Sequence, residues 1–331
     1  ESHAQRDAVL ETARNRQDWD WLVVLPAGVL LTEDAVLRMA GVAANDRKLA
    51  AIYGDSISLA DNGSVSTPEL KPQWNAALYL TRDYVGMFAV SREAMLRMKA
   101  AAGTEDAVDC LLLAASEPNG RSGVRRVARL LTQRPIDLAL ATPAEREVRR
   151  ASIERHLLRT DSSARVELES GGLRVIRALP SPAPLVSLIV PTRDRLDLLE
   201  PCIEGLRHRT DYPALEILIA DNHSRKAATR AYFATLGGDT RVRVIDCPGP
   251  FNFAAINNRA VAAAKGSVLG FINNDIEGMD ASWLREMVGR ACHAGTGAVG
   301  ARLLYASGLV QHGGVILGIG GYAGHAHRFF D

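Results

Sequence analysis

The feature that most constrains the fold is the run Val268–Asp275, in which an apolar segment ends abruptly in Asn273, Asn274 and Asp275. A continuous hydrophobic run bounded by turn signals is typical of a buried parallel strand. Polar side chains just past the carboxyl end of such a strand lie where open α/β sheets bind their ligands. Asp275 is therefore a candidate for holding a divalent cation against a phosphate-bearing substrate.

The sequence around this run predicts alternating strands and helices. Helical segments are expected to begin near residues 196, 251 and 280, and strands are expected over 186–191, 215–222, 241–246, 267–272 and 298–305. Strands that alternate with helices indicate βαβ units. The expected fold class is therefore α/β, with a mostly parallel sheet and flanking helices.

Residues 186–331 resemble the nucleotide-sugar-dependent glycosyltransferases of family 2, which have the GT-A fold. The resemblance rests on the segments Ser187–Arg193, Glu216–Asn222, Phe251–Asn258 and Asn273–Asp275, which occur in the family's order. Two later segments, 311–318 and 323–327, look like bacterial enzymes of O-antigen, rhamnan or other cell-surface polysaccharide assembly. The resemblance implies metal-assisted, inverting transfer of a sugar from a nucleoside diphosphate donor to a growing cell-surface glycan.

The resemblance also implies a donor site. Pro191 and Thr192 match the turn that lies against the nucleotide base, and Asp221 matches the acidic residue that reads the base edge. Asn258 matches a polar residue near the ribose and phosphates. These positions follow successive strands and are expected at one edge of the sheet.

The segment Asn273–Asp275 stands where the family has its Asp-x-Asp motif. The first position, facing the ribose, is Asn rather than Asp, whereas Asp275 keeps the carboxylate that binds Mn²⁺ or Mg²⁺. Such a cation neutralises the charge that develops on the leaving diphosphate. The complete set of predicted donor-binding residues is Pro191, Thr192, Asp194, Asp221, Asn222, Asn258, Asn273, Asn274 and Asp275, with Asp275 also the metal ligand.

Two simpler interpretations compete with these assignments. The polar residues at the strand ends have the composition of ordinary loops and helix caps. His312, His325 and His327 look like metal ligands, but their glycine-rich setting fits a flexible loop over the donor equally well.

The first half of the chain contains an internal repeat of the second. Val23–Arg38 aligns with Gly270–Arg285 without a gap, and the register continues far enough to pair Ala51-Ile52 with Ala298-Val299. The first copy has Pro26-Ala-Gly28 in place of the metal motif. We therefore expect two partial tandem copies, with all metal-dependent donor binding in the second and an acceptor-binding or architectural role for the first.

The first copy also carries segments that resemble the acceptor side of the family. Lys71–Trp74 and Leu78–Arg92 contain aromatic residues suited to stacking on sugar rings or, alternatively, to packing in a core. Asp106 matches the family's general base, which removes the proton of the acceptor hydroxyl. The alternative is that Asp106 only complements a helix N-terminus. The base of the second copy is expected beyond Asp331.

The expected domains are residues 1–140, the later part of a degenerate first GT-A domain; 141–184, a helical connector and Pro-rich hinge; and 185–331, the nucleotide-sugar-binding part of a second domain. The chain begins inside the first copy and ends before the second is complete. It is therefore interpreted as a fragment of a longer tandem protein.

Composition agrees with a soluble enzyme. A formal net charge of +1 gives no signal for nucleic acid. Four widely spaced cysteines fit a reducing compartment, and no apolar run reaches the roughly 18 residues that span a bilayer. The expected location is the cytoplasm, with peripheral association at the inner face of the membrane. The expected partners are a UDP-, TDP- or GDP-linked sugar and a glycan or lipid-linked glycan acceptor.

Two other function classes were weighed. A nucleotide-sugar-binding or scaffolding module would have the same donor site without its own chemistry. A different Rossmann-like enzyme, such as a dehydrogenase or nucleotidyltransferase, is disfavoured because no Gly-x-Gly-x-x-Gly turn follows Pro191.

Overall fold

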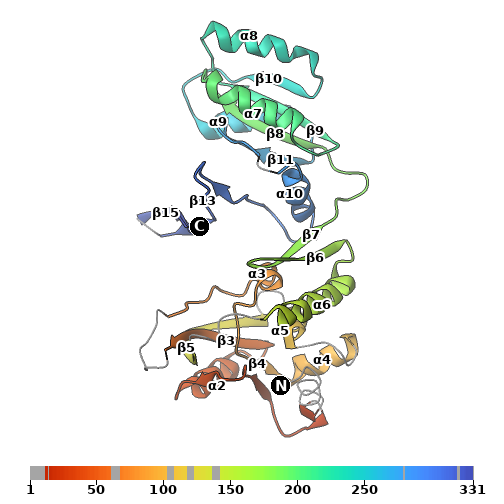
Figure 1. The fold of residues 1–331 in the computed structure, drawn as a ribbon, viewed down its shortest axis with the longest axis vertical. Coiled ribbons are helices and arrows are strands. Elements are labelled where there is room, and N and C mark those ends of the chain that lie inside the picture. Colours follow the sequence, from red (N-terminus) through yellow and green to blue (C-terminus); the bar gives the residue numbers. More distant parts are fainter. Residues whose placement is uncertain are drawn as a thin grey trace. The chain divides into compact units, whose positions relative to one another are not determined.

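The computed structural model of the chain describes residues 12–13, 15–60, 68–102, 108–117, 123–135, 142–278, 280–318 and 321–330. The chain divides into two compact units, unit 1 from Glu1 to Ile176 and unit 2 from Arg177 to Asp331 (Figure 1). Each unit has its own hydrophobic core. Among the described residues, no helix combines the length and the apolar character needed to cross a membrane.

Unit 2 is built on a parallel sheet whose strands lie in the order β10-β9-β8-β11. The chain runs outward from β8 through β9 to β10, and then returns to the other side of β8 to form β11. The sheet therefore reverses its strand order between β8 and β11, which is a topological switch point. This confirms the predicted α/β class. The strands are β8 (Val186–Thr192), β9 (Leu215–Asp221), β10 (Val242–Asp246) and β11 (Val268–Phe271).

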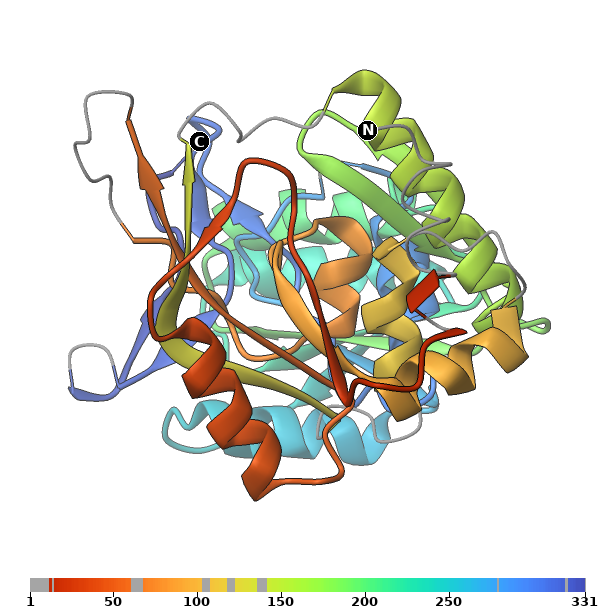
Figure 2. The same ribbon diagram turned by 90° about the horizontal axis from the view of Figure 1, so that it is seen from below.

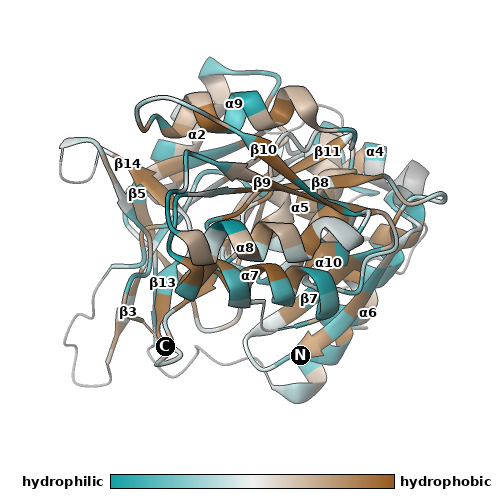
Figure 3. Cartoon of the chain, turned by 90° about the horizontal axis from the view of Figure 1, so that it is seen from above, coloured by the Kyte–Doolittle hydropathy of each residue, from teal (hydrophilic) through white to brown (hydrophobic). Residues whose placement is uncertain are grey.

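Helices cover both faces of this sheet. On one face, Leu199 and Ile203 join Leu284 over the strands, and on the other Ile256 and Ala260 pack against Ile189 and Leu218. Figure 3 shows the apolar colouring of β8 and β9 between helices of mixed polarity. The helices of this unit are α7 (Leu196–His208), α8 (Ala227–Thr235), the short η3 (Leu236–Gly238), α9 (Phe253–Ala263) and α10 (Trp283–Ala291).

A buried carboxylate ties the amino ends of these strands together. Glu216 accepts hydrogen bonds from Ser187 Oγ (2.5 Å), from the backbone N–H of Lys265 (2.6 Å) and from Arg243 Nη2 (2.8 Å). Burial by itself raises the pKa of Glu216. The hydrogen bonds and the Arg243 charge outweigh burial, so the pKa lies below the ordinary value.

Replacing this carboxylate, Glu216→Gln, is expected to destabilise unit 2 by about 2–3 kcal/mol at neutral pH, because charge-assisted hydrogen bonds are lost. A lowered folded-state pKa contributes stability above the unfolded-state pKa and loses it as pH falls through the folded-state value. The difference from wild type should therefore shrink below about pH 4. Urea denaturation at several pH values measures this. Glu200→Gln, exposed on α7, is the control; a Glu216→Gln loss that is constant with pH would contradict the assignment.

The predicted fifth strand over 298–305 is wrong for most of its length. Only Leu303–Leu304 form a strand, β12, which pairs with β13 (Val310–His312). Residues 298–302 have no strand partner among the described residues, and an apolar segment without a ladder to join does not become a strand. Beyond β13, only the small hairpin of β14 (Val315–Leu317) and β15 (Ala323–His325) follows.

Unit 1 has a mixed sheet in the order β1-β4-β3-β5-β2, in which β3 and β5 are parallel and β4 is antiparallel to both β1 and β3. Figure 2 shows these strands with α2 in red-orange and α6 in yellow-green. The elements are β1 (Trp21–Val24), β2 (Leu30–Leu31), α2 (Ala35–Asn45), β3 (Ala51–Leu59), α3 (Ala76–Thr81), β4 (Phe88–Ser91), α4 (Arg92–Ala102), α5 (Val108–Ser116), β5 (Val124–Pro135), α6 (Pro143–Thr160), β6 (Ala164–Glu169) and β7 (Gly172–Arg177).

The segment expected to connect two domains contributes to the core of unit 1. Helix α6 starts with a capping box between Thr142 and Glu145, and its Ile153 and Leu157 are buried in that core. The boundary between the two compact units falls at the end of β7. The residues that follow lead into β8.

Candidate functional site

The carboxyl ends of β8, β9 and β11 are joined by hydrogen bonds at the switch point. Thr192, the last residue of β8, accepts at its backbone oxygen from the Asn222 N–H (2.9 Å) and at its Oγ1 from Asn274 Nδ2 (3.1 Å). Thr192 is buried, so its neighbours hold it in place. The structure thus brings Pro191 and Thr192 together with the Asn273–Asp275 loop, as the order of the motifs predicted.

Asp221 ends β9 with its side chain partly exposed at the same edge. Its carboxylate accepts from Ser224 Oγ (2.5 Å) and from the Ser224 N–H (3.0 Å). Ser224 Oγ in turn accepts from the N–H of Asp194 (2.7 Å). Ser224 therefore fixes the carboxylate and the loop after β8 relative to each other. It was missed in the sequence, although a Ser three residues after an Asp is a recognisable turn signal.

Asp194 holds the two residues that immediately precede helix α8. Its Oδ1 accepts from the N–H groups of Arg225 (2.9 Å) and Lys226 (2.8 Å). The hydrogen bond from Lys226 is the main reason why the pKa of Asp194 lies below its usual value. This carboxylate therefore positions the loops of the site.

Asn222 is 2% exposed and holds the loop between β10 and α9. Its Nδ2 donates to the carbonyl oxygens of Cys247 (2.8 Å) and Gly249 (3.2 Å). On the following helix, Asn257 is buried and its Nδ2 donates to the Phe253 carbonyl oxygen (2.8 Å), whereas Asn258 is exposed. The exposed amide of Asn258 is the one open to a ligand.

In the loop after β11, the motif Asn273–Asp275 presents its first and third residues to solvent. Asn273 and Asp275 are exposed, and the Asn273 carbonyl accepts from Cys202 Sγ (3.6 Å), which ties the loop to α7. The pKa of Arg195 is raised, chiefly by its hydrogen bonds to Asp197 and to a smaller extent by the Asp275 carboxylate. A basic side chain therefore lies within electrostatic reach of Asp275.

These oxygen donors suit a hard divalent cation. Mg²⁺ and Mn²⁺ are commonly held by one or two carboxylates, with phosphate oxygens and water completing the coordination. Asp275 supplies an exposed carboxylate, and Asn273 an exposed amide oxygen, on the same short loop. The described residues contain no group of three His, Cys, Asp or Glu side chains able to enclose a metal ion without a substrate.

The histidines lie apart from this loop in the chain: His312 ends β13, His325 ends β15, and His327 lies in the turn that follows β15. His312 Nδ1 is 2.8 Å from His325 Nδ1, with the two rings edge to face. This contact is compatible with both interpretations, so metal ligation by the histidines and a flexible loop over the donor both stay predictions.

In unit 1, the aromatic residues of the expected acceptor region are in the core. Trp74, Tyr79 and Tyr84 are 4%, 1% and 8% exposed, and the Trp74 and Tyr79 ring centroids lie 5.2 Å apart. The core-packing alternative therefore holds for these three rings. Pro26-Ala-Gly28 lies between β1 and β2, and Asp106 lies outside the described residues.

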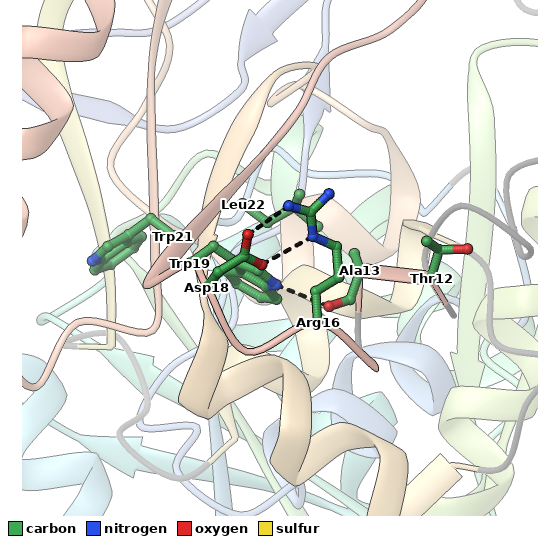
Figure 4. A pocket seen from close by; sticks show the side chains of 7 residues that line it. All are labelled: Thr12, Ala13, Arg16, Asp18, Trp19, Trp21 and Leu22. Atoms are coloured by element: carbon green, nitrogen blue, oxygen red, sulfur yellow. Dashed lines mark hydrogen bonds and ion pairs between the residues drawn. The ribbon is translucent and has the colours of Figure 1, made fainter.

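Unit 1 also has a surface hollow of about 480 Å³ around the start of β1 (Figure 4). Arg16 and Asp18 form an ion pair within its lining, and Trp19 Nε1 donates to the Ala13 carbonyl (2.9 Å). The lining residues are Thr12, Ala13, Arg16, Asp18, Trp19, Trp21 and Leu22, and they include none of the predicted donor-binding residues.

Comparison with known families identifies the second unit. Residues 187–315 match the model of glycosyl transferase family 2. Unit 2 carries a family 2 glycosyltransferase domain. The match begins in β8 and extends into β14, so it contains every strand end of the site. The predicted family is thereby confirmed for this stretch of unit 2.

Two curated relatives align with nearly the whole chain. An uncharacterized protein of Sinorhizobium fredii, y4gI, is 34% identical over 98% of this chain and 36% of its own length. The O-antigen biosynthesis protein RfbC of Myxococcus xanthus is 35% identical over 92% of this chain and 24% of its own length. The chain thus spans about a third and about a quarter of these relatives.

Among solved structures, the mannosyltransferase PcManGT of Pyrobaculum calidifontis, in complex with GDP-Man and Mn²⁺, is 22% identical over 36% of this chain and 35% of its own, with a TM-score of 0.32. Residues 1–349 of S. aureus TarS are 17% identical over 32% of both chains, with a TM-score of 0.29. Because both scores are low, the geometry of the site rests on this chain's own residues.

Proposed function

We propose that unit 2 binds the nucleoside diphosphate part of a nucleotide sugar, and that the protein transfers this sugar to a growing cell-surface glycan of the O-antigen kind. The observation that carries the proposal is the hydrogen-bonded switch point, where Thr192 and Asn274 join two strands of a family 2 domain. The similarity to an O-antigen biosynthesis protein supports the choice of acceptor class.

The nucleotide is proposed to lie across the ends of β8 and β9. Pro191 and Thr192 would border the base, and Asp221, held by Ser224, would accept hydrogen bonds from its edge. Asn258 and Asn273, both exposed, would contact the ribose and phosphates. Asp194 and Asn222 would act indirectly, because their polar atoms already fix the surrounding loops.

Asp275 is proposed to hold Mn²⁺ or Mg²⁺. When bound, such a cation supplies neutralisation of the charge on the diphosphate leaving group. Asp275 contributes the anionic ligand. Its carboxylate is exposed, so it can be reached by a donor from solvent.

Inverting transfer requires a base for the acceptor hydroxyl. Asp106 remains the proposed base in the first copy. We also propose that the acceptor is a glycan or a lipid-linked glycan, and that the protein acts at the inner face of the membrane.

Calorimetric titration of the chain with UDP, TDP and GDP, with and without Mn²⁺ or Mg²⁺, tests the proposal. We expect one saturable, metal-dependent site per chain, because Pro26-Ala-Gly28 offers no side-chain ligand in the first copy. Two sites per chain would show that the first copy binds donor as well. Failure of all three nucleotides to bind in the presence of metal would refute the donor site.

A second candidate is a nucleotide-sugar-binding module without turnover of its own. The observation that favours it is the absence of a strand over 298–302, where the first copy has the start of β3. Donor hydrolysis and transfer by the 331-residue chain, compared with those of the full-length natural protein, separate the two. Binding without turnover in the shorter chain alone would favour the module.

A further inference from the structure

The carboxylate of Asp221 has one oxygen occupied and one oxygen open. Its Oδ1 accepts hydrogen bonds from Ser224 Oγ at 2.5 Å and from the Ser224 N–H at 3.0 Å. Within the described part of the chain, Oδ2 has only a long contact of 3.3 Å with that same N–H. Each carboxylate oxygen offers about two lone-pair sites. Oδ1 is therefore filled, whereas Oδ2 keeps room for a hydrogen bond from a ligand.

The contact between Ser224 and Asp221 is fixed by the surrounding loops. A carboxylate only accepts hydrogen bonds, so the hydroxyl hydrogen lies between Ser224 Oγ and Oδ1. Ser224 Oγ also accepts the N–H of Asp194 at 2.7 Å, and Ser224 is 4% exposed. Asp194 Oδ1 in turn accepts the N–H groups of Arg225 and Lys226, which holds the turn that carries Ser224. The fold thus determines which carboxylate oxygen stays open.

The next side chain along the chain does not offer a hydrogen-bond donor beside this oxygen. The Nδ2 group of Asn222 already donates to the carbonyl oxygens of Cys247 at 2.8 Å and Gly249 at 3.2 Å, which uses both of its hydrogens. Asn222 is also 2% exposed. At the end of β9, a ligand therefore meets the acceptor Oδ2.

Nucleotide bases differ in what they present to such an acceptor. Uracil and thymine have one N–H donor on this edge, at N3, between two carbonyl groups. Guanine has two adjacent donors, N1–H and the N2 amino group, which pair best with both oxygens of one carboxylate. Cytosine has an acceptor nitrogen at N3, which a carboxylate repels. The number of open oxygens on the carboxylate therefore discriminates between the bases.

Resting on the proposed function, in which Asp221 borders the base, we propose that this half-occupied carboxylate selects uracil or thymine over guanine and cytosine. The donor is then a sugar linked to UDP or TDP. The open Oδ2 accepts the single N3–H of either pyrimidine. Guanine leaves one of its two N–H donors without a carboxylate partner, and a polar group left unpaired on binding costs affinity.

Titration of the chain with UDP, TDP, GDP and CDP in the presence of Mn²⁺ tests this selectivity. We expect UDP or TDP to bind at least about tenfold more tightly than GDP and CDP, because a hydrogen bond to a charged group is gained or lost. The UDP and TDP arms show which pyrimidine is preferred. If GDP or CDP binds as tightly as both, the selectivity is refuted but the donor site stands. If none of the four binds, the donor site itself is refuted.

Asp221→Asn gives a sharper measurement. The two Ser224 donors hold the amide oxygen at the place of Oδ1, so the amide nitrogen takes the place of Oδ2. That nitrogen donates, which suits N3 of cytosine and opposes the N3–H of uracil. The ratio of UDP affinity to CDP affinity should fall by at least about tenfold. An equal loss of affinity for UDP and CDP would show that Asp221 only supports the loop, which would overturn the proposal.

Ser224→Ala is the complementary variant. It removes the hydroxyl from Oδ1 and so opens a second acceptor site to guanine. The affinity for GDP relative to UDP should rise by at least about threefold, and an unchanged ratio would contradict the role given to Ser224. The matched control is Ser282→Ala, because Ser282 makes the same pair of hydrogen bonds to Asp280 Oδ1 through its N–H (2.6 Å) and its Oγ (2.8 Å). This control should leave the ratio unaltered.

Discussion

Asp275→Ala is expected to weaken metal-dependent binding of a nucleoside diphosphate to the chain by at least about tenfold, which is about 1.4 kcal/mol. In the full-length protein we expect the rate of sugar transfer to fall by about 100-fold or more, because stabilisation of developing charge is lost. The carboxylate is exposed at the end of β11, so its removal leaves the packing of the sheet intact. Titration with and without Mn²⁺ measures the first effect, and initial rates measure the second.

Glu277→Ala is the matched control for this variant. Glu277 lies two residues further along the same loop, is exposed and pairs with Arg209 at 2.7 Å. Its removal changes the net charge equally but should leave the metal dependence unaltered. If wild type and Asp275→Ala bind nucleotide with equal affinity in the presence and absence of metal, Asp275 is not the ligand.

Asp55→Ala is expected to destabilise unit 1 by about 3–5 kcal/mol, because it leaves Arg126, whose side chain is only 15% exposed, without its counter-charge. Asp55 is 2% exposed in β3 and accepts two hydrogen bonds from Arg126 of β5, at 2.9 and 2.7 Å. It also accepts from the backbone N–H of Lys71 at 2.9 Å. Urea denaturation measures the loss, and hydrogen exchange over β3 locates it.

The neighbouring arginine provides the control. Arg125 pairs with Asp46 at 3.1 Å, with side chains 49% and 33% exposed. An exposed pair of this kind is worth about 0–1 kcal/mol, so Asp46→Ala should have little effect. If Asp55→Ala and Asp46→Ala lower the free energy of unfolding by similar amounts, burial does not determine the strength of these ion pairs.

The two central strands of unit 2 were predictable because they are covered on both faces. The expected strand 186–191 differs from β8 by one residue, and the expected 215–222 contains all of β9. A strand buried on both faces needs a continuous apolar run, which is visible in the sequence without knowledge of its neighbours. The strand expected over 298–305 failed because forming a strand also requires a partner, and apolar pattern says nothing about whether one is present.

The grouping of the candidate site residues was also predictable in part. Motifs that follow successive parallel strands must meet at one edge, so Thr192, Asp221 and Asp275 could be grouped in advance. The hydrogen bonds of Asp194 and Asn222 could not be predicted, because their partners lie in other loops about 30 residues away. Examples of these partners are Lys226 and Cys247. Polar residue type indicates that a hydrogen bond is needed, but not with which group.

Taken alone, the amino-acid order was enough to establish the α/β class and the family resemblance and to suggest a repeat, since each depends on residue pattern along the chain. Only the tertiary structure distinguishes side chains that are exposed to solvent from those that already have structural partners. Asp275 and Asn258 are exposed, whereas Asp55 is paired with Arg126 and the Trp74 ring is enclosed in the core. Asp55 and Arg126 are 71 residues apart in sequence. Their pairing exists only because β3 and β5 lie side by side, and burial there turns a weak surface attraction into a strong structural one.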